Sequence, residues 1–221
     1  VNDLTVKQWD ESYGNIYSSF IDEGVETIMV GHMLLPHYVK YFNPTIKDED
    51  ILPATLSPEL INGLLKEQLG FNGLVVTDAS HMIGMAAAMK RRDSVPAAIA
   101  AGCDMFLFFN DFEEDFNYML EGYKNGVITE ERLQDELRRI LGLKASLKLH
   151  EKQKDGTLIP NKEGLKVVGC EEHLAMAKEA ADLGISLIKD TKNQLPIKPS
   201  THKRIRLHTL FGDGGFTGVD N

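Results

Sequence analysis

Three segments of the chain repeat the same order of elements: an amphipathic helix, a glycine and a short apolar strand. In the first, apolar residues recur at helical spacing over 6–23, Gly24 ends the helix, and a strand follows at 27–30. The other two units are the helix 57–69, opened by Ser57 and Pro58, with Gly70 and the strand 74–76, and the helix 93–101 with Gly102 and the strand 105–109.

The three predicted strands are almost wholly apolar, and each follows a helix. Strands of this kind are typical of parallel sheets that are covered on both faces. The alternation of helices with such strands therefore predicts an α/β fold, either a barrel or a doubly wound sheet.

The remainder of the chain predicts a second, separate region. Helical patterns continue over 111–124 and 129–149, whereas 151–169 loses all periodicity and is typical of a linker. A helix is expected again at 171–183, with strands at 185–188 and 204–210. We therefore expect a domain at 1–150, a linker at 151–170, and at 171–221 the beginning of another domain that the chain does not complete. The glycines at 212–215 could form a phosphate loop, but no helix follows to supply the amide groups.

Charge and hydropathy exclude two classes of partner. The 221 residues hold 24 Lys and Arg against 33 Asp and Glu, which gives a net charge of -9, and the basic residues form no stripe. We therefore expect no nucleic-acid partner. The apolar runs fall well short of the roughly 20 residues that a membrane span needs, so we also expect no membrane partner.

The two cysteines favour a reducing compartment. Cys103 and Cys170 are far apart in sequence, and Cys103 stands where a buried strand should begin, which favours reduced core thiols. No signal peptide is visible after Val1, although the N-terminus of the parent protein is expected to be missing. A cytoplasmic location is the expectation.

Candidate chemistry lies where each predicted strand ends, because the carboxyl ends of parallel strands share one edge of the sheet. These positions are His32, Asp78, and Asn110 with Asp111. Asp78 directly follows an apolar strand, which suits a nucleophile held at a rigid position. Spacing alone leaves open that it caps the following turn.

Three further side chains near these strand ends are candidate substrate ligands. His32 could bind a substrate hydroxyl or transfer a proton, or be a buried structural residue. His81 follows Asp78 closely and could also face solvent or pack in its loop, and Met82 would line the mouth or the core of a barrel. His32 and His37 lack the helical Glu motif of a metal site, so we expect no metal and no cofactor. The acidic group Asp111, Glu113, Glu114 and Asp115 is interpreted as a solvated helix start.

Several motifs, in one order along the chain, resemble family 3 glycoside hydrolases. PATLS at 53–57 and LLKEQLGFNGLVVTD at 64–78 look like the family's nucleophile region. IMVGHM at 28–33 and the segment 97–108 resemble its barrel, so that the match spans 6–149. AKEAA at 177–181 and LPI at 195–197 resemble its entry into a second, α/β sandwich domain.

The resemblance implies a fold and a mechanism. The fold is the C-terminal half of a (β/α)8 TIM barrel, followed by a linker and the beginning of an α/β sandwich domain. The aspartate that matches Asp78 attacks the anomeric carbon of a carbohydrate substrate and forms a covalent intermediate, which water hydrolyses with retention. The family's β-glucosidases usually carry tryptophan directly after the nucleophile, whereas Ala79 here looks more like the β-N-acetylhexosaminidase branch.

The resemblance also implies what the chain lacks. The family's acid/base histidine loop and its Lys-His pair have no match here, so the fragment alone is expected to be inactive. A half barrel would expose strand edges, which favours self-association or a partner that supplies the other half. A β-glucosidase of the same family and a non-catalytic interaction module remain alternatives. A barrel lyase or aldolase would need a lysine at a strand end, and none stands there.

Overall fold

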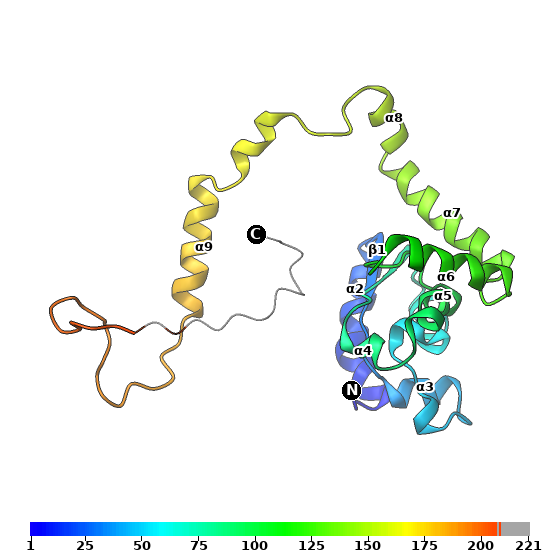
Figure 1. Ribbon diagram of the computed structural model, residues 1–221, viewed down its shortest axis with the longest axis horizontal. Helices are drawn as coiled ribbons and strands as arrows, with labels where there is room; N and C mark the ends of the chain where they lie inside the picture. Colours follow the sequence, from blue (N-terminus) through cyan, green and yellow to red (C-terminus); the bar gives the residue numbers. More distant parts are fainter. Residues whose placement is uncertain (207, 209–221) are drawn as a thin grey trace. The chain divides into compact units, whose positions relative to one another are not determined.

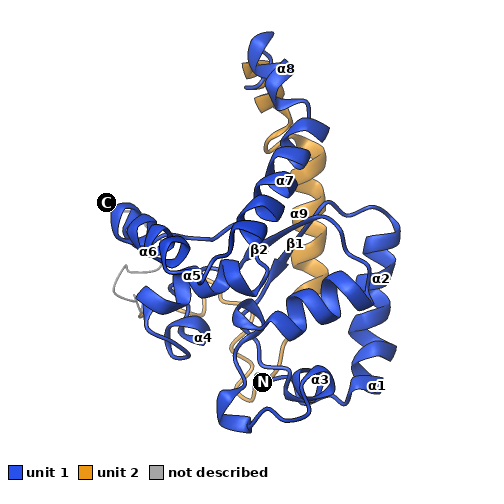
Figure 2. Cartoon of the chain, turned by 90° about the vertical axis from the view of Figure 1, so that its right-hand side faces the viewer, with its two compact units in different colours: residues 1–159 blue, residues 160–221 orange. Residues whose placement is uncertain are grey.

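The chain divides into two compact units. A computed structural model describes residues 1–206 and 208. The first unit is Val1–Ile159 and the second is Pro160–Asn221 (Figure 2). The boundaries of the predicted linker and second domain stay a prediction.

The first unit holds most of the secondary structure, and Figure 1 shows its short strand β1 among helices. In chain order its elements are α1 Val6–Trp9, π-helical η1 Asp10–Gly14, α2 Asn15–Asp22, β1 Thr27–Val30, α3 Pro36–Phe42, the 3-10 helices η2 Asp48–Asp50 and η3 Ala54–Leu56, π-helical η4 Glu59–Gln68, β2 Leu74–Thr77, α4 Ile83–Ala86, α5 Arg91–Ala101, α6 Phe112–Lys124, α7 Glu130–Ser146 and α8 Leu149–Lys154. The second unit contains the 3-10 helix η5 Lys162–Val167 and α9 Glu171–Gly184.

The sheet is parallel, as the sequence predicts. β1 pairs with β2 in a register that runs from Thr27 opposite Leu74 to Val30 opposite Thr77. A third segment joins through a single parallel bridge between Val76 and Met105. The first unit is therefore a mostly helical α/β structure, and the half barrel stays a prediction.

The predicted helix-ending glycines are confirmed by their backbone conformation. Gly24, Gly70 and Gly102 all have positive φ, at 84°, 73° and 122°. Only glycine adopts such angles without steric cost, and the chain can then leave the helix and turn into the strand. At Gly102 a side chain is excluded twice over, because a Cβ would lie 2.6 Å from Oδ1 of Asn62.

The predicted strand at 105–109 does not form beyond its first residue. Thr77 N–H donates to Met105 O at 3.0 Å, as in a ladder. At the next position the Thr77 hydroxyl replaces the backbone: it accepts from Leu107 N–H at 2.8 Å and donates to Leu107 O at 3.0 Å. Because a buried side chain takes up both backbone groups of Leu107, the segment continues without strand geometry.

The faces of the short sheet differ in burial. Ile28 and Val75 pack with Ile61, Leu65 and Phe71 in a core between the strands and the helix η4. Cys103 lies in the same core, which confirms its predicted burial, whereas Cys170 is only partly buried. On the other face Met29 is 55% exposed, so within the described residues β1 is not covered on both sides.

A buried carboxylate joins the sheet to two helices. Asp104 is inaccessible to solvent and accepts a hydrogen bond from Val75 N–H at 2.8 Å. Arg132 of α7 forms an ion pair with it, and Lys66 Nζ of η4 lies 3.9 Å from Asp104 Oδ1. Arg132 also donates to Ile99 O and Cys103 O, at 3.1 Å each. Charged groups held in this way satisfy one another and need no water.

One element predicted for the second unit is contradicted, and two others involve positions outside the described residues. The segment 185–188 is not a strand, and its side chains are strongly exposed: Ile188 is 91% accessible. Short apolar runs are ambiguous, and this one has no neighbour to pair with among the described residues. The strand 204–210 and the glycine loop 212–215 involve positions outside the described residues.

Among the helices that are described, none has both the length and the apolar character of a membrane span.

Glu136 of α7 should make stability depend on pH. Burial raises the pKa of its carboxyl to about 7, against the attraction of Arg132 and with the help of Asp104. The folded chain therefore holds a proton that the unfolded chain releases at lower pH, so stability is full at low pH and falls as pH rises through that folded pKa. We expect Glu136→Gln to raise the Tm relative to the wild type at about pH 8 and to raise it much less at about pH 5.

The measurement is thermal unfolding followed by circular dichroism. Glu131→Gln, at an exposed position of the same helix, is the matched control. Its Tm difference from the wild type should stay constant over this pH range. An equal pH dependence in both variants would contradict the assignment.

Candidate active site

Asp78 stands at the carboxyl edge of the sheet, one residue beyond β2. Its N–H donates to Val30 O at 3.0 Å, which extends the pairing between the two strands to the aspartate itself. Its Oδ1 accepts from Ala79 N–H at 2.7 Å. The side chain is half-buried. The backbone of this carboxylate is therefore fixed by the sheet, while the carboxylate reaches solvent.

His32 lies beside Asp78, as the strand-end rule predicts. Its Nε2 is 3.0 Å from Ala79 O, and its Nδ1 is 2.7 Å from the hydroxyl of Thr55. The hydroxyl of Thr55 is in turn 3.2 Å from the carbonyl oxygens of both Val30 and Gly31. One histidine thus connects the loop after β1, the loop after β2 and the helix η3.

The hydrogen-bond partners of His32 indicate the tautomer of its neutral ring. A carbonyl oxygen only accepts, so Nε2 carries a hydrogen and donates to Ala79 O. In the neutral ring Nδ1 then accepts from the Thr55 hydroxyl. In the cation Nδ1 donates, and the hydroxyl turns to the carbonyls of Val30 and Gly31. To bind a sugar hydroxyl, His32 would have to give up one of these protein bonds; that role stays a prediction.

A second set of residues, which the sequence reasoning missed, holds the other side of the Asp78 loop. Ser80 is buried, its N–H donates to Leu107 O at 2.8 Å, and its hydroxyl donates to Phe108 O. Arg91 Nη1 donates to the Ser80 hydroxyl at 3.1 Å and also forms a two-pronged ion pair with Asp115.

The interpretation of Asp115 as part of a solvated helix start is therefore wrong. Its side chain is 6% exposed and lies against Arg91, whereas Glu113 and Glu114 are exposed. Asp111 does begin α6 as expected, since its carboxylate accepts from Glu114 N–H at 2.8 Å.

The remaining predicted positions lie at the surface of this edge. His81 and Met82 are both exposed, and Met82 N–H donates to Ala79 O at 3.0 Å. Asn110 is exposed, and its N–H donates to Asp115. Over the described ranges, no cluster of three or more His, Cys, Asp or Glu side chains could hold a metal ion.

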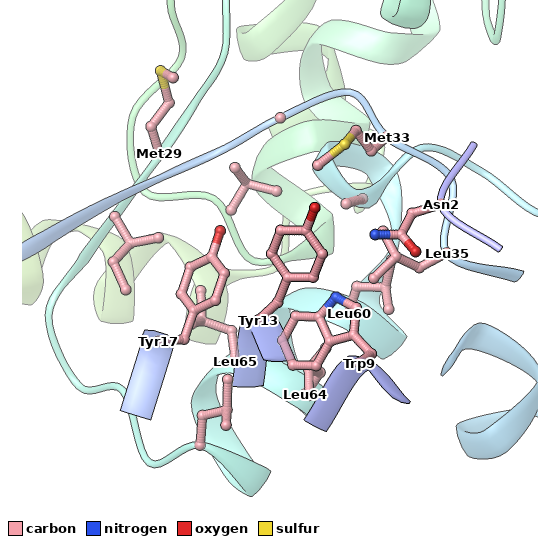
Figure 3. Close-up of a pocket in the computed structure, with 15 residues that line it drawn as sticks. Asn2, Trp9, Tyr13, Tyr17, Met29, Met33, Leu35, Leu60, Leu64 and Leu65 are labelled. Atoms are coloured by element: carbon pink, nitrogen blue, oxygen red, sulfur yellow. The ribbon is translucent and has the colours of Figure 1, made fainter. Parts of the chain in front are cut away.

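A small apolar cavity lies beside the end of β1, with Val30, Gly31 and Met33 in its lining. Its volume is about 130 Å³, and it includes none of His32, Asp78, His81 and Met82. Figure 3 shows the rings of Trp9, Tyr13 and Tyr17 gathered in it. The rings of Trp9 and Tyr17 are stacked, with centroids 5.9 Å apart. Its lining holds no carboxylate and no histidine.

Fold and site together define an α/β domain with a carboxylate held at the carboxyl edge of a parallel sheet. Residues 1–143 match the glycosyl hydrolase family 3 N terminal domain. The chain belongs to this family.

Relatives agree over much of the chain. A "Beta-N-acetylglucosaminidase/beta-glucosidase" of Cellulomonas fimi is 44% identical over 218 residues, which cover 99% of this chain and 38% of that protein. The structure of a "Beta-glucoside phosphorylase BglX bound to 2FGlc" is similar with a TM-score of 0.78 and 39% identity, over 90% of this chain and 35% of that one. A family 3 β-N-acetylglucosaminidase from Paenibacillus sp. str. FPU-7 has a TM-score of 0.57 and 28% identity, over 65% of this chain and 26% of its own. The chain thus spans well under half the length of these relatives.

Thr55 should stabilise the site through its hydroxyl. We expect Thr55→Val to lower the free energy of unfolding by about 1–3 kcal/mol, because it leaves His32 Nδ1 without its partner at a buried position. Urea unfolding followed by circular dichroism measures the change. Thr45→Val, at an exposed position, is the control and should cost at most about 0.5 kcal/mol. Equal costs for the two variants would contradict the role of the Thr55 hydroxyl.

Proposed function

We propose that this chain carries the nucleophile of a retaining glycosidase that acts on terminal β-linked sugars. Asp78 is the nucleophile. The observation that carries the proposal is the position of Asp78 in a chain of glycosyl hydrolase family 3. Asp78 is half-buried, its backbone N–H makes the last hydrogen bond of the sheet, and His32 hydrogen-bonds the carbonyl of the next residue. A rigid carboxylate open to solvent on one side suits attack on a bound sugar.

The chemistry assigns each oxygen of Asp78 a task. Oδ1 accepts from Ala79 N–H and so orients the carboxylate, which leaves Oδ2 to attack the anomeric carbon. The bond to the leaving group breaks while an acid protonates the departing oxygen. Water then attacks the anomeric carbon from the face that the leaving group left, the bond to Asp78 breaks, and the configuration is retained. We propose exo action on a β-linked N-acetylglucosamine; the choice of this sugar is supported by Ala79 and by the names of the Cellulomonas fimi and Paenibacillus relatives. A β-glucosidase of the same mechanism is the alternative on the same sheet edge.

A second candidate is phosphorolysis. The structural relative with 39% identity is titled a β-glucoside phosphorylase, in which phosphate would replace water as the acceptor. Both candidates share the glycosyl-aspartate and differ only in what attacks it. The product therefore discriminates them: a free sugar from water, a sugar phosphate from inorganic phosphate.

Covalent trapping tests the nucleophile. We expect a 2-fluoro sugar with a dinitrophenyl leaving group to add one glycosyl unit to the chain, at Asp78. Such a leaving group departs without help from an acid, so the reaction does not depend on a proton donor, and the fluorine slows hydrolysis of the adduct. Intact-protein mass spectrometry followed by peptide mapping measures the adduct.

Asp78→Asn is the matched variant and should remain unlabelled, while Asp111→Asn, at the residue that caps α6, should be labelled like the wild type. The measurement is run on the 221-residue chain and on the longest form of the protein that can be expressed. Labelling of the long form alone supports the proposal and shows that the chain needs further residues. If neither form is labelled, a non-catalytic interaction module becomes the better hypothesis.

Turnover, unlike labelling, needs an acid that protonates the leaving group. The family's acid/base histidine and Lys-His motifs have no match in this sequence, so we expect the 221-residue chain alone to release no aryl alcohol from an aryl N-acetylglucosaminide. Absorbance of the released phenol, with and without inorganic phosphate, measures it. Release that disappears in Asp78→Asn would contradict this expectation and would place the proton donor within the chain. A partner or second copy of the chain that restores release would be detected in the same assay by mixing.

A further inference from the structure

We propose that Arg91 and Asp115 are positioning residues for Asp78, acting through the hydroxyl of Ser80. The inference rests on the proposed function of Asp78 and extends it to two residues that do not touch the reacting atoms. It follows from hydrogen bonds that fix the loop after β2 to the segment after Met105.

The first step is that the Asp78 loop is held from two sides. On one side His32 bonds to Ala79 O. On the other, Ser80 bonds through both its N–H and its hydroxyl to carbonyls of the neighbouring segment, at Leu107 and Phe108. Asp78 and Ala79 are thus bracketed, and a shift of Ser80 displaces the carboxylate two residues before it.

The second step is that the Ser80 hydroxyl is itself fixed. A hydroxyl has one hydrogen and can rotate, but here it donates to Phe108 O while Arg91 Nη1 donates to its lone pair at 3.1 Å. The guanidinium of Arg91 is held in place, because its Nε donates to Asp115 Oδ1 at 2.8 Å and its Nη2 donates to the other carboxylate oxygen of Asp115. A two-pronged pair of this kind fixes direction as well as distance.

The third step is that Asp115 reaches back to the same edge. Its Oδ2 accepts from Asn110 N–H at 2.8 Å. The pair therefore joins helices α5 and α6 to both loops, at Ser80 and at Asn110. Arg91 also lies over the ring of Phe106, 5.8 Å from its centroid, within the same segment. Both charges are largely shielded from solvent, with 23% and 6% of their side chains exposed.

The same two helices provide a matched control. Arg92, next to Arg91 on α5, lies 3.7 Å from Glu121 of α6, and the two side chains are 70% and 55% exposed. This pair also links α5 to α6, but no hydrogen bond connects it to Ser80. Arg92→Ala removes an arginine between the same helices without touching the Asp78 loop.

The test measures labelling by the activated 2-fluoro sugar as a function of its concentration, in whichever form of the protein the wild type is labelled. For Arg91→Ala we expect the limiting rate constant to fall at least about tenfold, with the half-saturating concentration changed by less than about threefold, because a misplaced nucleophile slows the reaction more than it weakens binding. Arg92→Ala should match the wild type. Rates are referred to the folded fraction, measured by circular dichroism, so that loss of folded protein does not imitate the effect.

Ser80→Ala tests whether Arg91 positions Asp78 through the Ser80 hydroxyl. If Arg91 acts through Ser80, the double variant Ser80→Ala/Arg91→Ala should be no slower than the worse single variant, because neighbours in one chain of contacts are not additive. Multiplying effects would overturn the route through Ser80. A limiting rate for Arg91→Ala within about twofold of the wild type would overturn the positioning role itself.

Hydrogen exchange provides a readout that does not depend on glycosidase chemistry. In Arg91→Ala, the amides of Ser80 and Asn110 should exchange on the order of tenfold faster, while those of β1 stay as in the wild type. If the wild type is never labelled but these amides respond, the function of Asp78 has failed and the linkage stands. If it is labelled and these amides do not respond, the linkage has failed and the function stands.

Discussion

The first unit depends on the burial of one negative charge. Asp104 lies out of reach of solvent, and an isolated carboxylate there would cost several kcal/mol. It is retained because Val75 N–H, Arg132 and Lys66 surround it. Burial lowers the pKa of Lys66, and Asp104 opposes that shift. The ions thereby make the orientation of β2 depend on η4 and α7, and β2 ends at the candidate nucleophile.

The order of elements could be predicted because it depends on local rules. Positive φ at Gly24, Gly70 and Gly102 is a property of single residues, and the helices before them show their periodicity in short windows. The strand at 105–109 could not be predicted correctly, since the hydroxyl of Thr77, 30 residues from Leu107, takes the place of the ladder. The prediction of a strand at 185–188 was wrong for the opposite reason. Its apolar residues favoured pairing in a sheet, but no described residue pairs with them.

The site was predictable to the same extent. That Asp78 and His32 lie at one edge could be predicted because strand ends share it, and the structure joins them through Ala79; their roles stay a prediction. Thr55 lies within the PATLS motif at 53–57, but nothing in the neighbouring sequence reveals that its hydroxyl would hydrogen-bond the ring of His32, 23 residues away. Asp115 was misread because its charge resembled that of its exposed neighbours, and only Arg91, 24 residues earlier, explains its burial. Partnerships of this kind exist only after the chain has folded.

The Thr77 hydroxyl also limits how this sheet edge can change through mutation. Thr77 is wholly buried and uses its single hydrogen and its lone pair at once, on the two backbone groups of one residue. Serine could replace it, whereas valine, which has nearly the same shape and also favours strands, would leave Leu107 N–H unsatisfied and leave Leu107 O with only its bond from Ser80 N–H. A library that diversifies positions after Asp78 to alter sugar preference can therefore vary an exposed residue such as Met82, but it must keep a hydroxyl immediately before the aspartate.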